Sequence, residues 1–89
     1  MTEYTTEIYR HGYAFIVYGE LWEDGSGFWD EWDDTGKNFE VTHEPEFTIT
    51  EVYDEMDMRP VLLVSLTPME VYCIIDAFTE QYWDQYIHD

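Results

Sequence analysis

Carboxylates are the side chains in this sequence that could do chemistry, and they far outnumber the cations that could neutralise them. The 89 residues include 21 Asp and Glu but three Lys and Arg, which gives a net charge of −18 at pH 7. A small domain needs a net charge of only about 2–8 for solubility. A surface this negative is repelled by nucleic-acid phosphates and anionic lipids and attracted to cationic surfaces. We therefore expect no direct binding to nucleic acid or to a membrane.

One group of acids has a spacing that predicts an ordered row. Asp76, Glu80 and Asp84 are four residues apart, so on a helix they lie along one face with a repeat of about 6 Å. This repeat is close to that of the phosphates along one nucleic-acid strand. Like charges at this spacing destabilise a helix by a few tenths of a kcal/mol. The row is therefore a feature that helix formation does not explain.

A second group is the densest acidic segment and is interleaved with aromatic residues. Its acids are Glu23, Asp24, Asp30, Glu31, Asp33 and Asp34, and Trp29 and Trp32 lie among them. Charge combined with a few aromatic anchors is typical of a protein-binding interface. In a competing interpretation the tryptophans belong to the core or cover a sheet edge, and each acid is an ordinary solvated carboxylate.

Residue spacing does not favour metal binding or catalysis. The acids between residues 30 and 34 lack the alternate spacing before a Gly that a helix-loop-helix calcium site requires. His11, His43, His88 and Cys73 show none of the short paired spacings of zinc ligands. No nucleophile elbow, phosphate-binding Gly loop or catalytic triad is evident. We predict a protein that is not an enzyme and has no cofactor or metal.

The apolar content predicts that this acidic chain folds. Hydrophobic residues make up 45% of the sequence and aromatic residues 19%, which is enough apolar surface to offset the entropy of ordering the backbone. The length suits one domain, residues 1–89. No leader-like segment or apolar run long enough to span a membrane is present in this sequence, so we expect a cytoplasmic protein.

The elements that must position these acids are mainly strands. Five segments rich in aromatic and β-branched residues are predicted strands: 4–9, 13–22, 28–33, 38–43 and 46–53. Residues 10–12 are expected to form a hairpin connection between the first two, and Asp34-Thr35-Gly36 a turn between the next two. The charge-free run 61–66 is predicted to be a central strand buried on both faces.

A helix is expected to follow. Thr67, Pro68 and Glu70 match a capping box with Pro at the first helical position. Beyond them, apolar residues recur at spacings of three and four up to about Ile87, which predicts one buried stripe: Val71, Ile74, Ile75, Phe78 and Tyr82. The expected fold is α+β, an antiparallel meander sheet of about five or six strands with one C-terminal amphipathic helix packed on it.

In its size, its net charge of −18, its apolar core and rows such as Asp76, Glu80 and Asp84, the chain resembles the phage-encoded acidic nucleic-acid mimics. This functional class includes anti-restriction proteins, anti-CRISPR proteins and uracil-DNA glycosylase inhibitors. Its members have unrelated folds, so the resemblance implies neither a topology nor particular binding residues. It implies a viral inhibitor that acts in the host cytoplasm on a basic nucleic-acid-binding protein of a bacterium.

The leading hypothesis is an inhibitor that occupies the basic groove of a bacterial defence protein, with both acidic groups, Trp29 and Trp32 as its contact residues. One alternative is a protein-binding inhibitor or adaptor that acts outside the groove through the Trp-rich segment. Another is an acidic domain adapted to high salt. A homodimer is also left open.

Overall fold

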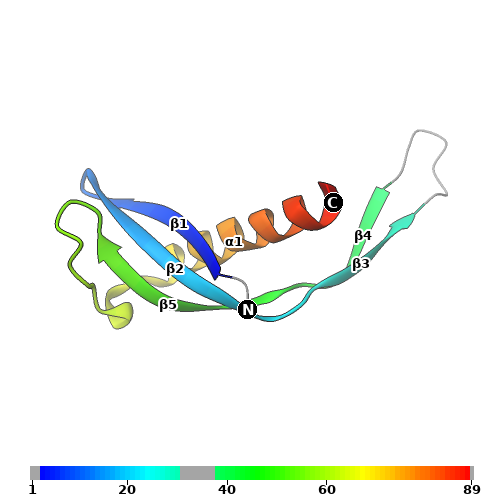
Figure 1. Ribbon diagram of the computed structural model, residues 1–89, viewed down its shortest axis with the longest axis horizontal. Coiled ribbons are helices and arrows are strands. Elements are labelled where there is room, and N and C mark those ends of the chain that lie inside the picture. Colours follow the sequence, from blue (N-terminus) through cyan, green and yellow to red (C-terminus); the bar gives the residue numbers. More distant parts are fainter. Residues whose placement is uncertain (1–2, 31–37, 89) are drawn as a thin grey trace.

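The structure is a computed structural model that describes residues 3–30 and 38–88. The predicted α+β class is confirmed: the described residues form five strands and one long helix (Figure 1). The elements are β1 (Glu3–Arg10), β2 (Tyr13–Glu23), β3 (Ser26–Asp30), β4 (Asn38–His43), β5 (Glu46–Asp54), a 3-10 turn η1 (Leu63–Ser65) and α1 (Pro68–His88).

The five strands do not form the single meander sheet that was predicted, because they are divided between two antiparallel sheets. One sheet has the order β1-β2-β5, and the other consists of β3 and β4. Because β2 leads into β3 and β4 leads into β5, the smaller sheet continues the β2–β5 ribbon away from the body (Figure 1). We call β3 and β4 the arm. With the arm, the molecule measures 52 × 27 × 23 Å.

The predicted hairpin connection between the first two strands is confirmed. Arg10 pairs with Tyr13, so His11 and Gly12 form a two-residue turn. Both have positive φ, 50° at His11 and 85° at Gly12. This is the backbone geometry that matches the twist of a tight β-hairpin. The short turn fixes the register of β1 against β2 over all eight pairs.

The arm forms the second predicted hairpin. β3 pairs with β4 from Ser26↔His43 to Asp30↔Asn38. The proposed turn at Asp34-Thr35-Gly36 lies outside the described residues.

Gly25 and Pro45 form the bend between body and arm. A Cβ at Gly25 would lie 2.8 Å from Cδ of Pro45, so the two strands can approach this closely only with glycine there. The Gly25 N–H donates to the hydroxyl of Tyr82 at 3.1 Å, and that hydroxyl donates to the Gly25 carbonyl at 3.2 Å. The Tyr82 side chain of α1 therefore holds the bend through the backbone of Gly25.

The core lies between the three-stranded sheet and α1. Its buried side chains come from each strand of that sheet and from the helix: Tyr4, Val17, Val52, Ile74, Phe78 and Tyr82. The predicted stripe is confirmed at the last three of these positions, while Val71 is 36% exposed. A Cβ at Gly19 would lie 2.5 Å from the ring of Phe78, so this glycine makes room for the largest fully buried side chain.

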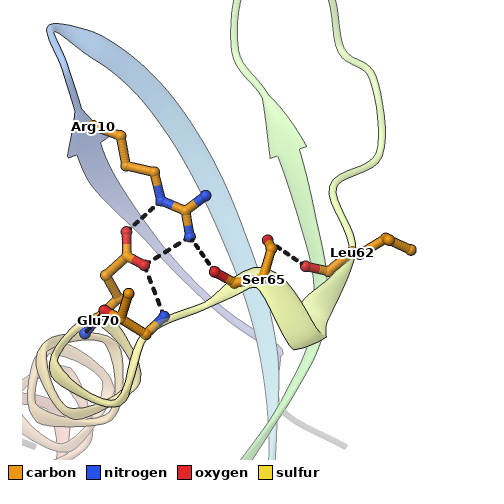
Figure 2. Close-up of polar contacts among 5 residues, drawn as sticks. Arg10, Leu62, Ser65 and Glu70 are labelled. Carbon is orange, nitrogen blue, oxygen red and sulfur yellow. Dashed lines mark hydrogen bonds and ion pairs between the residues drawn. The ribbon is translucent and has the colours of Figure 1, made fainter.

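The predicted capping box begins α1. The Thr67 hydroxyl accepts from the Glu70 N–H at 3.1 Å, and the Glu70 carboxylate accepts from the Thr67 N–H at 2.9 Å. Glu70 also receives hydrogen bonds from Nε and Nη2 of Arg10 at 2.5 and 2.7 Å (Figure 2). Through Arg10, the end of β1 is therefore fixed to the start of the helix.

The prediction of a buried central strand at residues 61–66 is wrong. The segment pairs with β5 at its start, where the Val61 N–H donates to the Val52 carbonyl, and then leaves the sheet as η1. Leu62 is 75% exposed and Val64 is 90% exposed. Pro60 has no N–H to extend the pairing, and β2 already holds the central position. Arg10 donates to the Ser65 carbonyl at 3.1 Å, which holds the segment in its turn (Figure 2).

Candidate protein-binding surface

The acidic segment predicted around residues 23–34 lies on the bend and the arm. Glu23 ends β2, Asp24 lies in the bend, and both are exposed. Asp30 is the last residue of β3 and pairs with Asn38. Glu31, Trp32, Asp33 and Asp34 lie outside the described residues. The structure thus places the first part of this segment at the surface and leaves the rest of the prediction untested.

Trp29 both packs and faces solvent. Its ring meets that of Phe39 edge-on at 5.2 Å, and Phe39 in turn contacts Trp83 and Tyr86 of α1. Trp29 nevertheless remains 46% exposed. Trp22 and Phe28 are 63% and 53% exposed. Trp29 therefore packs within the arm and keeps part of its ring exposed, and whether the ring is also a contact residue stays a prediction.

The predicted helical row lies on the exposed side of α1. Asp76, Glu80 and Asp84 are all exposed, whereas Ile74 and Phe78 point into the core. Glu80 and Asp84 border a shallow hollow of about 350 Å³. On the side of α1 that faces the sheet, the Gln81 side chain donates to the Thr5 carbonyl at 2.9 Å. The row is thus carried by a helix face that is anchored to β1.

The opposite side of the body carries a second acidic surface. Because Tyr4, Val17 and Val52 point toward the helix, their neighbours along each strand point away from it. We call this side the acidic sheet face: Glu3, Glu7, Tyr9, Tyr18, Glu20, Glu51 and Tyr53, with Glu55 beside it. Glu3 and Glu20 are direct cross-strand partners. Such partners have Cβ atoms about 5 Å apart, and like charges there oppose folding.

Glu7 and Glu55 form a further carboxyl pair on this face. The hydrogen bonds from Tyr9 and Glu55 lower the pKa of Glu7, and the hydrogen bond with Glu7 raises the pKa of Glu55. The Tyr9 hydroxyl donates to Glu7, which raises the pKa of Tyr9. Glu55 is therefore the member of the pair that holds a proton longer as the pH rises.

Glu23 and Glu46 form a third pair at the base of the arm. They are cross-strand partners of β2 and β5. The hydrogen bond with Glu23 raises the pKa of Glu46, and partial desolvation and the Glu23 charge raise it further. Nε2 of His43 lies 3.6 Å from Glu23. The nearby His43 opposes this shift, because its interaction with Glu46 lowers the pKa of that carboxyl group.

Within the described residues, no ion pair neutralises the two pairs on the acidic sheet face. Arg10 is engaged by Glu70 on the helix side. None of Glu3, Glu7, Glu20 and Glu55 has an ion pair within residues 3–30 and 38–88. The described surface therefore holds carboxylates close together with their charge uncompensated.

Sequence reasoning missed the acidic sheet face, although part of the signal was present. A two-residue turn at His11-Gly12 fixes the register of β1 and β2 and hence predicts Glu3 opposite Glu20. The Glu23–Glu46 pair carries no such signal, because the register of β2 and β5 shifts between Tyr18 and Gly19 and again between Leu21 and Glu23. Bulges of this kind cannot be located by counting residues.

Within the described ranges, no three His, Cys, Asp or Glu side chains are arranged to hold a metal ion. The single cysteine, Cys73, is an exposed free thiol. In that same part of the chain, α1 is not apolar enough to cross a membrane.

Comparisons with known proteins give no relative from which a role could be transferred. No protein-family model, curated protein or solved structure matches this chain.

Proposed function

We propose that this protein is an acidic nucleic-acid mimic that inhibits a bacterial DNA- or RNA-binding defence protein, of the anti-CRISPR or anti-restriction kind, by occupying its basic groove. The observation that supports it most is the set of facing carboxyl pairs on the described surface: Glu3 with Glu20, Glu7 with Glu55, and Glu23 with Glu46. Like charges in direct contact oppose folding, so a surface with no further role has no physical reason to retain them.

The arrangement suits a groove because acids lie on two sides of one narrow body. The acidic sheet face is on one side of the β1-β2-β5 sheet, and α1 with Asp76 and Glu80 covers the other. A duplex likewise presents phosphates on both of its sides. A cleft lined by Lys and Arg would therefore meet carboxylates on both walls, and binding would release the ions that had occupied that cleft.

The mechanism is steric and electrostatic. Long-range attraction between the protein, whose net charge is −18, and a basic groove speeds association. Direct contacts between its carboxylates and the Lys and Arg of the groove then exclude nucleic acid. Tyr18 and Tyr53, whose rings meet edge-on at 5.8 Å on the acidic sheet face, offer surfaces on which an arginine can stack. Association should thus be fast and strongly sensitive to salt.

The experiment that tests the proposal begins with capture of partners from bacterial lysate at about 0.05 M and about 0.5 M salt, followed by competition with nucleic acid. The expected partner is a basic nucleic-acid-binding protein that is held at low salt, released at high salt and displaced by its own nucleic acid. Binding that is indifferent to salt and leaves nucleic acid in place would overturn the proposal.

Two variants of equal charge locate the contact. Glu3→Gln with Glu20→Gln neutralises the acidic sheet face, and Asp76→Asn with Glu80→Gln neutralises the helix row. Each variant removes two negative charges, so both should lose the same affinity through net charge alone. The variant that loses more affinity than the other identifies the acidic surface that contacts the groove. We expect each to weaken binding about tenfold or more and to reduce its salt dependence.

The exposure of Trp22 and Phe28 favours a second candidate, an inhibitor or adaptor that binds outside the groove through the arm. In that case apolar contacts would dominate and charge would serve only to steer the encounter. The same competition assay separates the two candidates, because an arm-bound partner would still bind nucleic acid.

A further inference from the structure

A hollow of about 380 Å³ lies where the bend meets the last turns of α1, and we call it the bend hollow. Side chains from β1, the bend and the helix line it, among them Tyr4, Asp24, Tyr82, Gln85 and Tyr86. None of its lining residues belongs to the acidic sheet face or to the row on α1. Pockets for small molecules measure about 300–1,000 Å³, so the bend hollow suits a single side chain or a molecule of that size.

The walls of the bend hollow are held in place by the protein itself. The Tyr82 hydroxyl donates to the Gly25 carbonyl and accepts from the Gly25 N–H, and its ring packs edge-on against Trp83 at 4.9 Å. The Tyr86 ring stacks on that of Tyr82, with the centroids 6.1 Å apart and the planes 21° from parallel, and remains 46% exposed. A ligand therefore meets an aromatic surface that is already ordered, which lowers the entropic cost of binding.

Asp24 makes the bend hollow negative. Burial raises the pKa of both Tyr82 and Tyr4, and the charge of Asp24 adds to both shifts. The carboxylate is therefore close to these two hydroxyl groups. No Lys, Arg or His of residues 3–30 and 38–88 lines the hollow, and within these ranges Asp24 has no ion pair. The hollow thus combines aromatic rings with a carboxylate that no cation of the described residues neutralises.

We propose that the bend hollow is a binding site for a guanidinium group, and that in the complex with a basic partner it receives an arginine side chain of that partner. A guanidinium group is planar and weakly hydrated, so it stacks on an aromatic ring while its N–H groups donate to nearby oxygens. Tyr86 supplies the exposed ring, Asp24 the carboxylate and Gln85 an amide oxygen.

The same lining disfavours other classes of ligand. An anion would meet Asp24 on a body of net charge −18. A metal ion such as Ca²⁺ takes six or more oxygen ligands, and within the described ranges no three candidate side chains gather to hold one. An ammonium group is a strongly hydrated point charge without a flat face to stack on a ring. A guanidinium is therefore the group that uses the ring and the carboxylate together.

The role of the bend hollow in a complex rests on the proposed function, because it needs a basic partner. Binding of a guanidinium group does not rest on it, and is tested first on the purified protein alone.

The test is a titration of the purified protein with capped arginine, N-acetyl-arginine N-methylamide, followed through the backbone amide signals by NMR. We expect the signals of Gly25, Gln85 and Tyr86 to shift and saturate with a dissociation constant of about 1–10 mM. The amides of Asp57 and Glu80, outside the hollow, should shift less and without saturation. Capped lysine should bind at least about threefold more weakly, and capped citrulline, the uncharged counterpart of arginine, should not saturate. Equal shifts over the whole surface, or equal binding of capped lysine, overturns the proposal.

Two pairs of variants locate the binding. Asp24→Asn removes the carboxylate of the hollow, and Asp57→Asn makes the same charge change outside it. Tyr86→Leu removes the exposed ring, and Tyr72→Leu removes a tyrosine that is 69% exposed elsewhere on α1. The first member of each pair should raise the dissociation constant for capped arginine at least about threefold, and its control should leave it within about twofold. Controls that weaken binding as much as the hollow variants overturn the proposal. If melting curves show that Tyr86→Leu is unfolded, the exposed Asp24 and its control decide the outcome.

The captured partner identifies the source of the guanidinium group. We expect Asp24→Asn to weaken binding of the partner more than Asp57→Asn does. Equal losses, with capped arginine still dependent on Asp24, would mean that the hollow takes a free guanidinium compound, and would overturn its assignment to the partner. Saturation by capped arginine without any partner that nucleic acid displaces would contradict the proposed function alone, so the two failures are distinguishable.

Discussion

Glu23 and Glu46 are direct partners across β2 and β5, and a hydrogen bond joins their carboxyl groups. The raised pKa of Glu46 means that the folded state holds this proton more tightly than the unfolded chain, whose ordinary value is 4.5. Stability is therefore lost as the pH rises through the folded pKa. We predict that Glu46→Gln raises the melting temperature by about 2–4 °C at pH 7. Below about pH 4.5 the gain should vanish.

Thermal melts of both proteins between pH 3 and 8 measure this difference. Asp57→Asn, at an exposed position that does not belong to a facing pair, provides a control with the same charge change. An equal gain from the control would attribute the effect to net charge and not to the facing pair.

The Arg10–Glu70 pair gives a pH dependence of opposite sign. Arg10 first, and the Thr67 N–H second, lower the pKa of Glu70 to about 2. Its contribution is thus present above pH 4.5 and is lost as the pH falls toward 2. We predict that Glu70→Ala lowers the free energy of unfolding by about 2 kcal/mol at pH 7, because it removes both the cap and the ion pair.

Urea denaturation at pH 7 and pH 3 checks the prediction for Glu70. Glu70→Gln separates its two parts, since the amide oxygen can still accept from Thr67 but carries no charge. The conservative variant should lose less stability than Glu70→Ala. If the two variants behave alike, the cap contributes nothing measurable.

Gly19 should not tolerate a side chain. An added Cβ would lie 2.5 Å from the Phe78 ring and 2.9 Å from the Thr48 carbonyl. Because Phe78 is fully buried, its ring has little room to move, and Gly19→Ala is expected to cost about 1–3 kcal/mol. Equilibrium unfolding measures the loss, with Phe78→Leu in the same background as the check. Partial rescue by that second substitution is expected, and an unchanged stability of Gly19→Ala would mean that the helix packs elsewhere.

The salt dependence of folding separates the mimic from a salt-adapted domain. Lowering salt from 0.15 M to 0.01 M lengthens electrostatic screening from about 8 Å to about 30 Å, so repulsion within the −18 body should grow. A mimic scaffold should nevertheless melt cooperatively in dilute buffer, with a melting temperature that rises gradually with salt. A chain that needs molar salt to fold would support the salt-adapted alternative.

Trp29 and the acids should differ in their effect on partner binding. If the groove is the target, Trp29→Ala should weaken binding less than Glu3→Gln with Glu20→Gln. Titration calorimetry with the captured partner compares them, with melting curves to confirm that the arm is retained. A larger loss from Trp29→Ala would favour the arm-bound adaptor.

Local patterns predicted much of the fold. The His11-Gly12 hairpin and the Thr67–Glu70 capping box each rest on a few adjacent residues, and both are confirmed. The run 61–66 misled because an uncharged apolar segment is equally consistent with a buried strand and an exposed surface. Which one forms depends on whether the segment goes on pairing with the edge strand β5, and here the pairing ends at Val61 before the chain turns into η1.

The candidate surface was harder to predict than the fold. The row on α1 depends only on the four-residue spacing of its acids within one helix, so the exposure of Asp76 and Glu80 could be predicted. The pairing of Glu23 with Glu46 depends on two register shifts between strands far apart in the chain. Long-range register of this kind is a property of the packed structure and not of any short segment.

The contact of Phe39 with Trp83 and Tyr86, at 5.4 and 5.6 Å, joins the arm to the last turns of α1. Helix ends open more readily than helix centres, and a two-stranded hairpin is barely stable by itself. The arm and the end of the helix therefore form one cooperative unit, in which fraying of the helix removes the support of the hairpin. Amide hydrogens of the arm and of the helix end should therefore exchange with solvent at similar rates. A ligand that binds the arm alone should also slow hydrogen exchange at the end of α1, although it makes no contact there.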